Sequence, residues 1–263
     1  MVDSEKIFKR IKKNVGRAIT DFNLIEEGDR IIVGISGGKD SYTLLHVLEA
    51  LRKKAPVQFD LIAVNIDPGF PGYRTDLIEA YLRQQRLHYH METTRNYAII
   101  EENLRPGTSY CAFCARLRRG FLYTLADRLG CNKIALGHHL DDFIETLLLN
   151  QFYSGKLAAM SAKLKADNGK HIVIRPMVYV EESDILKLSQ AMNFPIVHCS
   201  CPTSEETDQN RQRMKRLVRE LAADIPDIRH SMINALKNIQ HRHLLTPQKE
   251  SPKTRERKTG EQD

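Results

Sequence analysis

Ile31-Ile32-Val33-Gly34-Ile35-Ser36-Gly37-Gly38-Lys39-Asp40-Ser41 is the segment around which this 263-residue chain is built. Its β-branched run is too short for a helix and predicts a strand that is buried on both faces. Two glycines then permit a tight turn. From Ser41 to Leu51 the apolar residues recur at helical spacing, which predicts a helix. We call residues 36–41, between the strand and the helix, the glycine loop.

The glycine loop predicts a site for an anion. Backbone N–H groups at the start of a helix have no partner within the helix, and the helix dipole adds partial positive charge. Lys39 adds a full positive charge. The spacing of the glycines is neither that of the Walker A motif nor G-x-G-x-x-G. An ordinary strand-to-helix turn is the alternative, but six consecutive residues of suitable type favour a phosphate site.

Further apolar runs predict a doubly wound α/β fold with a mostly parallel sheet. Strands are expected over residues 59–67, 88–92, 133–137 and 171–176, in addition to the one before the glycine loop. Helices are expected over residues 5–24, 41–51, 74–86, 97–104, 117–129, 142–153 and 182–192. Such alternation is typical of parallel sheets with right-handed crossovers. Ligands in these folds lie at the carboxyl ends of the strands, where Ser36 and His138 should meet.

Composition favours a cytoplasmic protein with a polyanionic partner. No apolar run of about 18 residues could span a membrane, and the N-terminus shows no apolar signal segment. The formal net charge is +7. Basic residues gather in three clusters: Lys6, Lys9, Arg10, Lys12, Lys13 and Arg17; Arg116, Arg118 and Arg119; and Arg211, Arg213, Lys215, Arg216 and Arg219. Solvated helix faces would explain any one cluster, whereas three favour a nucleic acid.

Five cysteines predict a metal or redox site. Cys111 and Cys114 form a C-x-x-C pair, and Cys199 and Cys201 follow roughly ninety residues later. In a chain without a signal segment, such cysteines bind metals or do redox chemistry more often than they form disulfides. Four thiolates would suit zinc, whereas three on an iron–sulfur cubane would leave one iron open. We interpret Cys131, at the entry of a core strand, as structural.

Taken together, four motifs resemble the tRNA 2-thiocytidine synthetase family of the ATP pyrophosphatase superfamily, also called the PP-loop superfamily. They are S-G-G-K-D-S at 36–41, C-x-x-C-x-R-L-R-R-G at 111–120, G-H-H-L-D-D at 137–142 and I-R-P at 174–176. The resemblance covers about residues 30 to 200. It implies an α/β PP-loop fold that uses ATP, Mg²⁺ and an oxygen-sensitive [4Fe-4S] cluster. The implied reaction adenylates the C2 carbonyl of cytidine 32 in the tRNA anticodon loop and replaces its oxygen with sulfur, yielding AMP and pyrophosphate.

The resemblance also assigns roles to residues. Ser36, Gly37, Gly38, Ser41 and Gly137 would bind ATP, with Lys39 offsetting the charge of the departing pyrophosphate and Asp40 binding Mg²⁺. One of Asp141 and Asp142 would serve magnesium or proton transfer, and at least one would cap a helix. Arg118 would neutralise the adenylate or a tRNA phosphate, unless it is only part of a solvated helix face. Cys111, Cys114 and Cys201 would hold the cluster, with Cys199 as the alternative third ligand.

The domain organisation follows from these assignments. We expect a basic N-terminal helix at 1–24, an ATP-binding catalytic domain with the cluster cysteines at 25–200, a helical segment at 201–245 and a disordered tail at 246–263. The expected partners are tRNA, a sulfur donor such as a cysteine desulfurase, and a second copy of the chain. Two alternatives stay open: a tRNA-uridine 2-thiolase of the same superfamily, and a non-catalytic RNA-binding protein with a structural zinc site.

Overall fold

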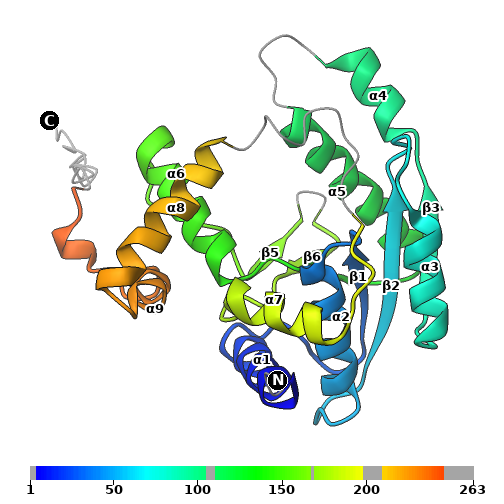
Figure 1. The fold of residues 1–263 in the computed structure, drawn as a ribbon, viewed down its shortest axis with the longest axis horizontal. Coiled ribbons are helices and arrows are strands. Elements are labelled where there is room, and N and C mark those ends of the chain that lie inside the picture. The colour runs from blue at the N-terminus through cyan, green and yellow to red at the C-terminus, as the bar shows by residue number, and fades with distance from the viewer. Residues whose placement is uncertain (1–3, 105–109, 167–168, 198–208, 246–263) are drawn as a thin grey trace, which may run out of the picture.

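The computed structural model describes residues 4–104, 110–166, 169–197 and 209–245, whose core is a six-stranded sheet (Figure 1). The strands lie in the order β3-β2-β1-β4-β6-β5. All neighbours pair in parallel except β5 and β6, which are antiparallel. The strands are β1 (Asp29–Ile35), β2 (Phe59–Asp67), β3 (Tyr89–Thr93), β4 (Lys133–Ala135), β5 (Lys163–Lys165) and β6 (Ile172–Ile174). The predicted α/β fold with a mostly parallel sheet is confirmed.

Helices alternate with the strands and continue beyond them. They are α1 (Ser4–Asp21), α2 (Lys39–Arg52), α3 (Thr75–Gln84), α4 (Asn96–Asn103), α5 (Tyr110–Arg128), α6 (Leu140–Ser154), α7 (Glu182–Ala191), α8 (Gln209–Asp224), α9 (Ile228–Ala235) and the short 3-10 helix η1 (His241–His243). In Figure 1, α1 lies beside α7, whereas α8 and α9 lie near α6, away from β2 and β3.

Strand β1 is buried on both faces, as its β-branched run predicts. Ile31, Val33 and Ile35 join the large core that includes α1, α2 and α7. Ile32 points to the other face, where it joins a smaller core with Leu125 of α5. Because side chains alternate along a strand, a strand covered by helices on both faces must be apolar at successive positions.

The register of the sheet brings two strand ends together. Val33 of β1 pairs with Ala135 of β4, so the residues that follow both strands leave the sheet at the same edge. Ser36 and His138 were predicted to meet at this edge; the contact observed there is between Gly137 and Asp40.

Helix α1 is part of the main core. Ile7, Ile11 and Val15 recur at helical spacing and are fully buried. Arg10 of α1 donates from Nε to Asp184 of α7 at 2.6 Å. The packed apolar face and this ion pair fix α1 against α7.

Two elements differ from the prediction. Helix α5 begins at Tyr110 rather than near residue 117, because Tyr110, Cys114 and Leu117 pack with Phe70 and Ile100 in a small separate core. Strand β5 was not predicted: it has only three residues, and its central Leu164 is exposed, as is typical of an edge strand. The predicted C-terminal tail at 246–263 lies outside the described residues. No helix in the described ranges is long and apolar enough to cross a membrane.

Candidate functional site

The glycine loop turns sharply at Gly37. This residue has φ of 81°, and a Cβ there would lie 2.8 Å from the Cβ of Val197. The backbone N–H of Val197 donates to the Gly37 carbonyl at 3.0 Å. Both the left-handed conformation and the contact with Val197 therefore require glycine.

The N-terminus of α2 is open to a ligand. The hydroxyl of Ser41 donates to the Gly38 carbonyl at 2.8 Å, which braces the loop from inside. The N-cap residue is Gly38, and no side chain caps the helix. The first N–H groups of α2 are thus available to an anion, as the sequence predicts.

Gly137 lies against the glycine loop. A Cβ at Gly137 would lie 3.1 Å from the carbonyl carbon of Asp40 and 3.2 Å from the backbone nitrogen of Ser41. The chain leaving β4 can approach the start of α2 this closely only because residue 137 lacks a side chain.

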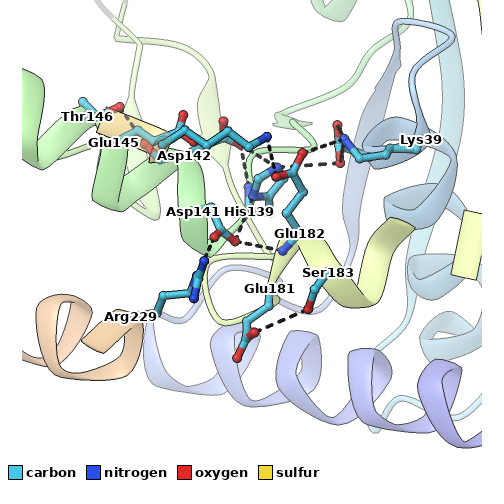
Figure 2. A network of polar contacts seen from close by, with 12 residues as sticks. Lys39, His139, Asp141, Asp142, Glu145, Thr146, Glu181, Glu182, Ser183 and Arg229 are labelled. Carbon is cyan, nitrogen blue, oxygen red and sulfur yellow. Dashed lines mark hydrogen bonds and ion pairs between the residues drawn. The ribbon is translucent and has the colours of Figure 1, made fainter. Parts of the chain in front are cut away.

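Lys39 lies between two carboxylates. Its ammonium is 3.3 Å from Asp40 Oδ1 and 3.2 Å from Oε1 of Glu182, the first residue of α7 (Figure 2). Burial alone would lower the pKa of Lys39, but the charges of Asp40 and Glu182 outweigh it and raise that pKa. Lys39 therefore carries its positive charge when a phosphate arrives.

Glu182 also contacts a second lysine. Its Oε2 lies 2.6 Å from the ammonium of Lys215 on α8. Burial would raise the pKa of Glu182, but the hydrogen bonds and charges of Lys215 and Lys39 lower it to about 2. Nothing in the sequence indicates this contact, since an acidic residue in the first turn of a helix is ordinary.

Asp40 has the features of a ligand for a hard cation. Its Oδ1 is buried and accepts no hydrogen bond from the described residues. Burial raises the pKa of this carboxyl. A buried carboxylate oxygen that makes no hydrogen bond fits Mg²⁺, although the Lys39 ammonium lies 3.3 Å from it. No three His, Cys, Asp or Glu side chains cluster as metal ligands within the described ranges.

Asp141 and Asp142 cap two different helices. Asp142 Oδ2 accepts the backbone N–H of His139 at 2.9 Å, at the start of α6. Asp141 Oδ2 accepts the backbone N–H of Glu182 at 2.8 Å, which places it at the N-terminus of α7 (Figure 2). Both carboxylates thus have capping contacts, and that of Asp141 joins α6 to α7.

Two arginines from the C-terminal helices reach these acids. Arg229 of α9 donates from Nε to Asp141 Oδ1 at 2.8 Å. Arg211 of α8 donates to Asp142 Oδ1 and Glu145 Oε2, both at 3.1 Å. Burial raises the pKa of Glu145 to about 7, although the charge of Arg211 opposes it. Arg229 and Glu145 were missed in the sequence because their partners are set by tertiary packing alone.

His138 is held in its neutral form. Arg175 donates from Nε to His138 Nδ1 at 3.2 Å, and from Nη1 to the Ser161 carbonyl at 2.7 Å. Burial and the positive charge of Arg175 lower the pKa of His138 to about 4. Because Nδ1 accepts this hydrogen bond, the ring proton lies on Nε2.

The cysteines are only partly described. Cys111 lies in the first turn of α5 and Cys114 one turn later, where its side chain is half-buried. Cys131 is buried in the core, in agreement with its interpretation as structural. Cys199 and Cys201 lie outside the described residues. The described chain before them ends at Val197, against Gly37.

Arg118 is exposed on α5, with Arg116 and Arg119. No ion pair or hydrogen bond joins it to another described residue. The structure thus leaves Arg118 apart from the contacts of the glycine loop.

Comparison with known proteins gives consistent matches. Residues 5–221 match the model of the PP-loop domain family. The tRNA-cytidine(32) 2-sulfurtransferase of Syntrophotalea carbinolica is 65% identical over 92% of this chain and 93% of its own length. That of Geobacter metallireducens is 58% identical over 92% and 94%. Among solved structures, the U34-tRNA thiolase NcsA from Methanococcus maripaludis with its [4Fe-4S] cluster has a TM-score of 0.72. It is 22% identical and covers 89% of this chain and 78% of its own, a likeness that concerns the fold.

Proposed function

The chain belongs to the PP-loop family, and within it to the tRNA-cytidine(32) 2-sulfurtransferases, and from this membership we propose how its residues carry out the reaction. The enzyme uses ATP to replace the C2 oxygen of cytidine 32 in tRNA with sulfur. The products are 2-thiocytidine in the tRNA, AMP and pyrophosphate.

The C2 oxygen of cytidine is a poor leaving group, and adenylation allows it to leave as part of AMP. The carbonyl oxygen at C2 attacks the α-phosphorus of ATP, and the bond to pyrophosphate breaks. Sulfur then bonds to C2, and the bond from C2 to oxygen breaks to release AMP. The protein must therefore hold the phosphates, stabilise the charge on the departing pyrophosphate and exclude water.

One observation carries the proposal: the uncapped start of α2 lies beside a charged lysine. The N–H groups after Gly38 bind phosphate oxygens, and Lys39 offsets the negative charge that develops as pyrophosphate leaves. Ser36, Gly37 and Ser41 shape the loop. Gly137 permits the segment after β4 to lie against it.

Asp40 is the proposed magnesium ligand. Its Oδ1, which is buried and accepts no hydrogen bond from the described residues, supports this assignment, and Mg²⁺ held by Asp40 would supply positive charge for the phosphates. Asp141 and Asp142 act by holding α7 and the start of α6 in place. The neutral His138 offers its Nε2–H as a hydrogen-bond donor at the same edge of the sheet. Arg118 is the proposed contact for a tRNA phosphate.

The cysteines fit an iron–sulfur cluster. We assign Cys111, Cys114 and Cys201 as ligands, with Cys199 as the alternative third. The position of Cys111 and Cys114 one turn apart in the sequence of α5 supports this, and so does the position of Val197 beside the glycine loop. When bound, a [4Fe-4S] cluster on three cysteines supplies an iron position open to sulfur. The sulfur enters at the oxidation level of sulfide. The proposed source is a cysteine desulfurase together with a thiol reductant, which supplies the two electrons that release sulfide from the persulfide.

The test is product analysis in the absence of oxygen. Protein, ATP, a sulfide source and a tRNA transcript are incubated, the tRNA is digested, and nucleosides are identified by mass spectrometry. Chromatography of the nucleotides distinguishes AMP from ADP. We expect 2-thiocytidine at position 32 with one AMP for each modified base. Thiouridine would support the uridine thiolase instead, and the absence of AMP would support a non-catalytic RNA-binding protein.

A further inference from the structure

Helix α8 carries basic residues on two faces with different environments. Arg211 and Lys215 lie one turn apart and face the site, where they contact Asp142, Glu145 and Glu182. Arg213, Arg216 and Arg219 are exposed to solvent. No carboxylate of the described chain forms an ion pair with these three arginines. Helix α8 thus pairs with acids of α6 and α7 on one face and exposes unpaired arginines on another.

Helix α5 presents a second group of unneutralised arginines. Arg116, Arg118 and Arg119 are exposed, and within the described ranges none of them forms an ion pair. Leu122 and Leu125 of α5 pack with Ile32 of β1 and Ile134 of β4, the two strands that lead to the glycine loop and to His138. The charge of Arg119, after burial, also helps to lower the pKa of Arg175. Since Arg175 donates to His138, this group lies near one side of the site.

The two helices that carry these groups flank one short segment. His138 contacts Arg175 on the side of α5, whereas the backbone of His139 is held by Asp142, the partner of Arg211 on α8. Adjacent residues after β4 therefore link both helices to the glycine loop, which Gly137 contacts. Figure 1 shows that α5 and α8 are otherwise separate elements.

The basic residues of α1 have a different environment. Lys9 pairs with Glu5 at 2.6 Å, Arg10 bonds to Asp184, and Arg17 pairs with Asp21 at 3.4 Å. Arg17 also lies over the ring of Tyr179, 4.8 Å from its centre. At least three cations of this cluster are thus paired within the chain, and two of them, Arg10 and Arg17, also attach α1 to Asp184 and Tyr179.

We propose that the tRNA backbone binds across the exposed arginines of α5 and α8, on both sides of the nucleotide site, and that α1 is not part of this surface. This inference rests on the proposed function. It assigns tRNA binding to the basic clusters of α5 and α8 and not to that of α1. Guanidinium groups without protein partners bind phosphates by releasing counterions from the nucleic acid. Cations already paired with carboxylates gain less, because the existing ion pair must be broken. Arg118 belongs to this surface.

Three triple variants that remove equal charge test the inference. They are Arg116/Arg118/Arg119→Gln, Arg213/Arg216/Arg219→Gln and, as the matched control, Lys9/Arg10/Arg17→Gln, which removes the three α1 cations that are paired within the chain. The affinity of the full-length protein for a tRNA transcript is measured over a range of salt concentrations. Binding of ATP to the same samples, followed by calorimetry, shows that the fold and the nucleotide site are intact.

The expected result is that both arginine variants bind tRNA about tenfold more weakly and have a salt slope lower by about 2, as expected when two or three phosphate contacts are lost. The α1 variant should stay within about twofold of wild type with an unchanged slope. A loss in the α1 variant equal to that in the arginine variants would overturn the inference. A loss in only one of the α5 and α8 variants would overturn the two-sided surface. If the wild-type protein bound no tRNA at all, the proposed function itself would fail.

Discussion

Glu182 holds Lys39: the carboxylate at the start of α7 lies 3.2 Å from the ammonium of the glycine-loop lysine. The same carboxylate contacts Lys215 of α8. A group distant in sequence therefore positions the lysine of the glycine loop, and α8 connects to that loop through Glu182.

Glu182→Gln should slow the reaction by misdirecting Lys39. The amide keeps the size of the side chain but loses its charge, so Lys39 is no longer held by two acids. We expect the kcat for AMP formation to fall by about 10- to 100-fold, as happens when a group in an active site is slightly misplaced. Affinity for tRNA should change little. The measurement is the rate of AMP release with saturating ATP and tRNA.

The neighbouring Glu181→Gln is the matched control. Glu181 contacts Ser183 and His230 but not Lys39. The kcat of the Glu181→Gln variant should therefore remain at the wild-type value. Equal loss in both variants would show that Glu182 acts only through general stability.

Gly137→Ala should disturb the glycine loop directly. The added Cβ would lie 3.1 Å from backbone atoms of Asp40, which cannot move away as a flexible side chain would. We expect a loss of about 1–3 kcal/mol in the free energy of unfolding, together with weaker ATP binding. Urea titration and calorimetry with ATP measure both effects.

Gly120→Ala makes the same chemical change in open space, since a Cβ at Gly120 meets nothing within 4 Å. That variant should be as stable as the wild type or more stable, because alanine favours the helix by about 0.5–1 kcal/mol. Normal ATP binding by the Gly137→Ala variant would contradict the close contact between Gly137 and Asp40.

Glu145 should make stability depend on pH. Its pKa in the folded protein is about 7, above the ordinary value of 4.5, so the folded state binds a proton more tightly than the unfolded chain. This stabilisation is present below pH of about 4.5 and is lost as the pH rises through about 7. The difference in free energy is at most on the order of 3 kcal/mol.

Glu145→Gln should therefore gain stability relative to wild type as the pH rises from about 5 to about 8. Thermal unfolding across this range measures the difference. Glu220→Gln, at an exposed position on α8, serves as the control. If the difference in stability between Glu145→Gln and wild type were the same at every pH, a raised pKa of Glu145 would be excluded.

Replacing the cysteines should separate thiolation from nucleotide binding. Cys111→Ser and Cys114→Ser should lose 2-thiocytidine formation and bound iron while still binding ATP. Cys131→Ser, in the core, should keep both iron and activity. Comparison of Cys199→Ser with Cys201→Ser identifies the third ligand, and we expect the loss in Cys201→Ser. Normal thiolation by Cys111→Ser would contradict the cluster assignment.

The parallel sheet and the glycine loop could be predicted because their signals are local. The run around Val33 has the composition of a buried strand, and Gly37 occupies a turn that only glycine adopts easily. The start of α5 could not be located, because it depends on the packing of Tyr110 against Phe70, forty residues earlier. Likewise, the contacts of Glu182 with Lys39 and Lys215 join three separate helices. In the sequence such charges cannot be distinguished from ordinary helix ends.

The central claim is that the glycine loop works together with an iron–sulfur cluster on three cysteines. The most direct test is the iron, sulfide and zinc content of protein purified without oxygen, together with its visible absorption spectrum. The account predicts a brown protein with about four irons and four sulfides per chain, and loss of both in Cys111→Ser. A colourless protein that holds zinc tightly after reconstitution with iron and sulfide would contradict it.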